Sequence, residues 1–95
     1  MIKVSVLYPA GDGITFDMDY YKTKHMEIVQ RVMPGLRKVE IDSRVDGPYI
    51  AVGNLYFDSL EALGAAMGGA GEAMADVVNF TNAQAVLQTS EVVTG

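Results

Sequence analysis

The sequence predicts an α+β fold, in which a four-stranded antiparallel sheet carries helices on one face. Three observations support this fold class. Apolar residues recur with the period of a strand or a helix in the order strand, helix, strand, strand, helix, strand. Residues 46–48 (Asp-Gly-Pro) form a turn between the two middle strands, which predicts a hairpin. The strand after this turn is apolar on both faces, as expected of a central strand.

This order of elements, βαββαβ, is that of ferredoxin-like domains, and right-handed crossovers put both helices on the same face of the sheet. The first strand is expected at residues 2–9, because the side chains there alternate between two faces. Residues 9–13 (Pro-Ala-Gly-Asp-Gly) then have the composition of a loop.

The predicted first helix, residues 18–32, carries the only histidine of the chain. Asp17 or Asp19 can cap its start, and Pro34-Gly35 ends it, because proline disfavours a helical residue before it and glycine tolerates a left-handed exit. At helical spacing, one face carries Met18, Tyr21, His25, Ile28, Val29 and Val32. The histidine is therefore expected to point toward the protein interior.

The middle strands are expected at residues 36–45 and 49–58. The first of them has one polar face, which is typical of an edge strand. Its other face would carry Val39, Ile41, Ser43 and Val45.

A second helix is expected to begin after Ser59, whose hydroxyl can cap it. This helix should weaken at Gly64 and break at residues 68–71, because each interior glycine costs about 1 kcal/mol relative to alanine. A second helical piece is expected at 72–80 and the last strand at 84–93. We expect the glycine-rich stretch 64–71 to be mobile and to gate a pocket.

The composition excludes several classes of function. The chain of 95 residues is expected to form a single domain over 1–95, and its net charge of −5 would repel nucleic acid. It has no cysteine and one histidine, so we expect no metal site of the common zinc type. No cofactor is expected, since the sequence has no dinucleotide or phosphate-binding glycine motif. No apolar run is long enough for a membrane span, and we expect a cytoplasmic protein.

A homodimer is expected from two features. Hydrophobic residues make up 49% of the chain against 20% charged residues, which is more apolar surface than a small sphere needs. The third strand lacks a polar face, so the sheet needs a cover opposite the helices, and a second copy of the sheet would supply it. Two sheets packed face to face form a dimeric α/β barrel.

The chain also resembles a known family. Phe16, Tyr20-Tyr21 and Lys24-His25-Met26 are similar to the F-x-x-x-Y-Y-x-x-x-H signature of the EthD-like proteins, and the similarity continues through residues 73–81 and 88–92. The EthD-like family, named after a gene cluster for ethyl tert-butyl ether degradation, resembles the wider dimeric α/β-barrel superfamily. That superfamily includes cofactor-free monooxygenases, polyketide cyclases, muconolactone isomerases and haem-binding enzymes, so the fold alone does not identify a reaction.

His25 and Tyr21 are the candidate catalytic residues. Imidazole titrates near neutral pH, so His25 can act as a general acid or base, and the alternative is a core histidine with a hydrogen bond. Tyr21 lies one helical turn before it, where its hydroxyl would orient the ring or the substrate. The alternative for Tyr21 is a core aromatic residue.

Four further residues are candidates for binding a substrate. Tyr8, Asn54 and Tyr56 lie on strands expected beneath the first helix, and Asn54 can donate a hydrogen bond to a developing oxyanion. The pattern does not decide which face of the third strand points to the helices. Met67 can line an adaptable apolar pocket, although methionines more often fill core gaps.

Three functions remain open at this point. The first is a cofactor-free enzyme that moves a proton or oxidises an apolar substrate, aromatic or polyketide-like, with His25 as acid or base. The second is a non-catalytic small-molecule-binding or accessory protein of a catabolic or biosynthetic pathway. The third is a dimeric structural or stress protein. A pocket of about 300 Å³ or more that touches His25 would favour the first two.

Overall fold

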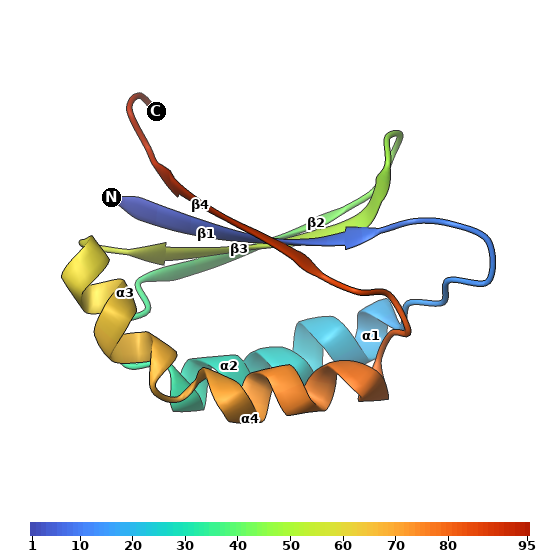
Figure 1. Cartoon of the computed structure of the whole chain (residues 1–95), viewed down its shortest axis with the longest axis horizontal. Helices are drawn as coiled ribbons and strands as arrows, with labels where there is room; N and C mark the ends of the chain where they lie inside the picture. The colour runs from blue at the N-terminus through green and yellow to red at the C-terminus, as the bar shows by residue number, and fades with distance from the viewer.

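The computed structural model describes residues 1–95 and confirms the predicted order of elements. The strands are β1 (Ile2–Pro9), β2 (Lys38–Ser43), β3 (Tyr49–Phe57) and β4 (Val86–Glu91). The helices are α1 (Met18–Tyr20), η1 (Tyr21–His25), α2 (Met26–Val32), α3 (Leu60–Met67), α4 (Ala70–Ala75) and η2 (Asp76–Asn79). The sheet is antiparallel throughout, with strand order β2-β3-β1-β4. All helices lie beneath one face of the sheet, and nothing covers the other (Figure 1).

The register of the sheet decides which side chains meet the helices. On β1, Val6 lies opposite Gly53 of β3 and Leu87 of β4, and this parity faces the helices. The alternate parity places Leu7 opposite Val52 and Val86 on the uncovered face. The third strand is therefore central, as predicted, and its two apolar faces have different neighbours.

The first helix begins and ends where the sequence predicts, at residues 18 and 32. Asp17 caps it, because its Oδ1 accepts a hydrogen bond of 3.1 Å from the amide of Tyr20. A π-helical turn, η1, interrupts the α-helix, which the periodicity did not predict. Such turns are rare and are often found at functional sites. Here the turn carries both candidate catalytic residues.

The second helical segment differs from the prediction in one respect. Ser59 caps α3 as expected, with its Oγ accepting a bond of 3.1 Å from the amide of Ala62, but the helix continues through Gly64 without weakening. The break comes at residues 68–69, and α4 starts at Ala70. Gly69 lies directly on the carbonyl oxygen of Val32, so the joint packs against the end of α2. The predicted break within residues 68–71 is thus confirmed, and the close contact with Val32 leaves room only for glycine at position 69.

The two edge strands are shorter than predicted. β2 ends at Ser43, so Val45 falls in the turn and is fully exposed instead of sharing a face with Val39. β4 occupies the other edge, and most of its side chains are exposed. No helix in the structure is long and apolar enough to cross a membrane.

Candidate functional site

A cavity of about 400 Å³ lies between the helix-facing side of the sheet and the helices that pack against it. Twenty residues line it, of which 17 are hydrophobic. Strand residues such as Val4 and Leu55 line the side formed by the sheet, and residues of α2 and α4 line the opposite side. His25, Tyr21, Tyr8 and Met67 also line it. The structure thus brings four of the six predicted site residues to one cavity.

His25 joins this cavity to a buried carboxylate. Its side chain is only 4% exposed, and Nδ1 lies 2.9 Å from Oδ2 of Asp76. An ionised carboxylate can only accept hydrogen bonds, so Nδ1 carries the hydrogen and the neutral ring has its free electron pair on Nε2. Nε2 has no hydrogen-bond partner in the protein. No side-chain nitrogen or oxygen without such a partner is fully buried, so Nε2 must be accessible. Nε2 therefore faces the cavity.

Asp76 is held by two further donors. The hydroxyl of Tyr20 lies 2.7 Å and the amide nitrogen of Asn79 2.9 Å from its Oδ1. Burial acts to raise the pKa of Asp76, but the hydrogen bonds from Asn79, Tyr20 and His25 outweigh it and lower the pKa. The carboxylate thus stays ionised and keeps the imidazole in one orientation and one tautomer.

The sequence analysis did not identify Asp76 as a site residue. One signal was available, because Asp76 follows the small buried residues Ala66, Ala70 and Ala73 at helical spacing. A lone acidic residue on a buried helix face needs a partner, and the only histidine was the natural one. The two residues are 51 positions apart in the sequence, which hides this pairing from an analysis of local patterns.

Tyr21 and Tyr8 lie next to the imidazole. The Tyr21 ring stacks on His25 with centroids 5.4 Å apart, and the Tyr8 ring meets Tyr21 edge-on at 5.5 Å. The Tyr21 hydroxyl sits directly over Gly53, where any Cβ would overlap with it. The hydroxyls of Tyr8 and Tyr21 interact with each other, and no buried side-chain oxygen is left without a partner. Both tyrosines line the same cavity as His25.

Burial raises the pKa of Tyr8 to about 12, although the hydroxyl of Tyr21 lowers it in part. Burial also raises the pKa of Tyr21, and the Tyr8 hydroxyl and the charge of Asp42 raise it further. At neutral pH both hydroxyls are therefore protonated. They can donate hydrogen bonds to a ligand but cannot act as bases.

The raised pKa values predict that these two tyrosines ionise at a higher pH in the folded protein than in the unfolded chain. A pKa raised in the folded chain stabilises the fold below pH about 10, and this contribution is lost as the pH rises toward the folded value. Hydrogen bonds to Asp76 and Glu40 also raise the pKa of Tyr20 and of Tyr56. Tyrosinate absorbance of the native protein should therefore show ionisation after the pH midpoint seen in concentrated guanidinium chloride, with Tyr8 and Tyr21 ionising last. Tyr8→Phe should remove part of the late component. A single native transition near pH 10 would contradict the buried, protonated pair.

Comparison with solved structures identifies the family. The crystal structure of an EthD-like protein from Ralstonia eutropha JMP134 superposes with a TM-score of 0.88 at 35% sequence identity, covering 98% of this chain and 92% of that one. The chain belongs to the EthD-like family. The resemblance carried by Phe16, Tyr20-Tyr21 and His25 is thereby confirmed. No protein-family model matches the chain, and no curated protein sequence matches it.

More distant structures share the fold of this EthD-like chain. An ethyl tert-butyl ether degradation (EthD) family protein from Bacillus halodurans C-125 has a TM-score of 0.69 at 21% identity, covering 98% of this chain and 99% of that one. A putative antibiotic biosynthesis monooxygenase from Deinococcus radiodurans has a TM-score of 0.62 at 14% identity, covering 99% and 93%. The ferredoxin-like fold predicted from the sequence is confirmed.

Two candidate residues of the EthD-like chain lie away from the cavity. Asn54 and Tyr56 have the opposite parity to Gly53 and point to the uncovered face of the sheet. There the Asn54 amide accepts from Ser5 at 3.1 Å and donates to Asp42 at 2.9 Å. Tyr56 donates to Glu40 at 2.6 Å. The expectation that these two residues line a pocket with His25 is corrected, because strand parity separates them from it.

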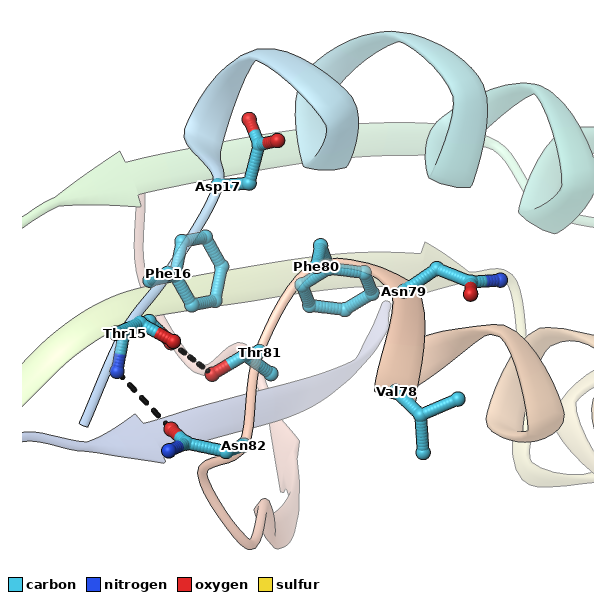
Figure 2. Close-up of a pocket in the computed structure, with 8 residues that line it drawn as sticks. All are labelled: Thr15, Phe16, Asp17, Val78, Asn79, Phe80, Thr81 and Asn82. Atoms are coloured by element: carbon cyan, nitrogen blue, oxygen red, sulfur yellow. Dashed lines mark hydrogen bonds between the residues drawn. The ribbon is translucent and has the colours of Figure 1, made fainter. Parts of the chain in front are cut away.

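A second hollow, of about 390 Å³, lies outside the cavity where the loop before α1 meets the loop after η2. Its polar groups bond to each other: the amide of Thr15 donates to Asn82 at 3.0 Å, and the Thr81 hydroxyl donates to the Thr15 carbonyl at 2.7 Å (Figure 2). Phe16 and Phe80 lie behind these bonds, with ring centroids 5.3 Å apart. The polar residues of this hollow therefore hold the two loops together and are not free to bind a ligand.

Proposed function

We propose that this EthD-like protein is a cofactor-free enzyme that transfers a proton to or from an apolar small molecule bound in the cavity. The observation that carries the proposal is the free Nε2 of His25, which faces an apolar cavity while Asp76 fixes the ring from behind. A buried general base of this kind needs no metal or prosthetic group to move a proton.

Each polar group at this end of the cavity has a separate role in the proposal. His25 accepts a proton from a carbon or oxygen of the substrate through Nε2, and Asp76 stabilises the imidazolium that forms. Tyr21 and Tyr8, which stay protonated, donate hydrogen bonds to the oxygen on which negative charge develops. The same arrangement suits the first step of a cofactor-free oxidation, in which removal of a proton activates the substrate. Met67 forms part of the apolar wall that binds the rest of the substrate.

Exchange of hydrogen with solvent tests the proposal directly. β-Tetralone is an apolar bicyclic ketone with acidic C–H bonds beside its carbonyl group. Purified protein in deuterated buffer should accelerate loss of these proton signals, followed by NMR, above the rate in buffer alone. Binding of β-tetralone without any acceleration of exchange would contradict the proposed proton transfer. It would support the alternative of a binding or accessory protein.

We further propose that the protein acts as a cytoplasmic homodimer in which the uncovered sheet faces pack together. A related structure of ferredoxin-like fold from Bacteroides fragilis NCTC 9343 is described as dimeric. On the uncovered face, Leu7 forms an apolar row with Val52 and Val86 across three strands. Obligate interfaces commonly bury about 2,000 Å² or more, and a whole sheet face is of this order.

Leu7→Lys should shift the protein toward monomers, because it places a charge at the centre of the proposed interface. Sedimentation velocity at micromolar concentration measures this change. Val78→Lys is the matched control, since Val78 is 81% exposed on the helix side, and it should leave the dimer intact. A monomeric wild-type protein, or a Leu7→Lys variant as dimeric as the control, would contradict the proposal.

A further inference from the structure

The wall of the cavity carries no ordinary charged side chain. No lysine, arginine, aspartate or glutamate is among its 20 lining residues. Its polar atoms gather at one end, at His25 and the hydroxyls of Tyr8 and Tyr21, apart from Gln84, which is exposed to solvent. The cavity is thus apolar along most of its surface and has hydrogen-bonding groups at one end.

The cavity has no positively charged side chain that could pair with an anionic ligand. Moving a carboxylate out of water is costly unless a cation replaces the lost hydration. The only group here able to become a cation is the imidazole of His25, and Asp76 already lies 2.9 Å from its Nδ1.

A cationic ligand would be equally unpaired. The one carboxylate near the cavity, that of Asp76, accepts hydrogen bonds from His25, Tyr20 and Asn79 and lies behind the imidazole. It cannot contact a ligand while the ring is in place. Neither sign of charge is therefore compensated at the hydrogen-bonding end.

An oxygen that accepts hydrogen bonds suits this end instead. Tyr8 and Tyr21 line the cavity, and among hydrogen-bonding side chains their hydroxyls interact only with each other. When one hydroxyl donates to the other, the second O–H has no acceptor in the protein. A ligand carbonyl would give this O–H an acceptor next to Nε2 of His25. The volume of about 400 Å³ is in the usual range for small-molecule sites and would accommodate a fused bicyclic compound.

We infer that the substrate is an uncharged, largely apolar molecule with one acceptor oxygen, such as a ketone, which binds with that oxygen at Tyr8 and Tyr21. This inference rests on the proposed function, because it takes the cavity beside His25 as the site of reaction. It goes further in excluding carboxylates and amines of the same size and shape.

Three probes of nearly equal shape test this specificity by equilibrium dialysis. They are β-acetylnaphthalene, the carboxylate β-naphthoate, and β-isopropenylnaphthalene, in which a CH₂ group replaces the ketone oxygen. The ketone should bind most tightly. The carboxylate should bind roughly 10-fold or more weakly because its charge is unpaired, and the alkene about 5-fold more weakly because it lacks the acceptor. Affinities of ketone and carboxylate within a factor of about two, or no binding by any probe, would overturn the inference.

Two variants assign the selectivity to the cavity. Tyr8→Phe should reduce the preference for the ketone over the alkene and leave alkene affinity nearly unchanged. Gln84→Lys introduces a cation among the lining residues and should strengthen carboxylate binding selectively. An unchanged ketone preference in Tyr8→Phe, or no gain for the carboxylate in Gln84→Lys, would count against the inference.

Because these measurements need no turnover, they separate the inference from the proposed reaction. Selective binding of the ketone without hydrogen exchange would contradict the proposed reaction and support the inferred ligand class. Hydrogen exchange together with tighter binding of the carboxylate would support the proposed reaction and overturn the inferred ligand class.

Discussion

His25→Asn should slow the exchange of deuterium into β-tetralone by roughly 10²-fold or more while changing the melting temperature little. The amide of asparagine can occupy the position of Nδ1 and keep the hydrogen bond to Asp76. It has no atom at the position of Nε2, which is the nitrogen that faces the cavity. Exchange rates from NMR and thermal melts on the same samples separate the two nitrogens of one side chain.

Lys24→Asn provides the matched control, because it introduces the same residue on the exposed side of the same helical turn. Its exchange rate should equal that of the wild type. Equal rates for His25→Asn and Lys24→Asn would show that His25 is not the acid or base. If His25→Asn instead lost several degrees of stability with no loss of rate, His25 would be a core residue that serves Asp76.

Gly69→Ala should destabilise the protein by about 2 kcal/mol, which lowers the melting temperature by roughly 10 °C in a domain of this size. A Cβ at this position would overlap with the carbonyl oxygen of Val32, and backbone on both sides leaves neither group free to move. The helices α2 and α4, which form two walls of the cavity, would have to separate.

Gly64→Ala should have the opposite effect. Gly64 lies inside α3 with open space around its Cα, so an added methyl group meets nothing and improves helix propensity by about 1 kcal/mol. Melts must be compared at one protein concentration, because association shifts the apparent stability. Two glycines only five positions apart would then differ in sign, and equal effects would contradict the packing at Gly69.

Most of the fold was predictable because the signals that specify it are local. The bounds of the first helix follow from Asp17 at one end and Pro34-Gly35 at the other, and the hairpin follows from the turn at residues 46–48. The continuation of α3 through Gly64 was not predictable from helix propensity, since α3 packs against β3 and α4 and buries Ala66, which outweighs one glycine.

The candidate site was only partly predictable. Spacing alone put Tyr21 and His25 on one inward face, and the two-residue period put Tyr8 on a strand beneath them. The same period left two possible directions for Asn54 and Tyr56, because alternation is symmetric and contains no information about which face meets the helices. Gly53, whose missing side chain admits the Tyr21 hydroxyl, marks that face only once the helix is in place.

The sequence by itself therefore determines the order of strands and helices, the caps, and the residue types able to move a proton. The tertiary structure alone decides that Asp76 orients His25, that Nε2 is free, and that the cavity beside it carries no charge. The physical reason is range. Periodicity and capping depend on neighbours within one or two turns, whereas the contact between His25 and Asp76 joins residues 51 positions apart and exists only after the helices have packed on the sheet.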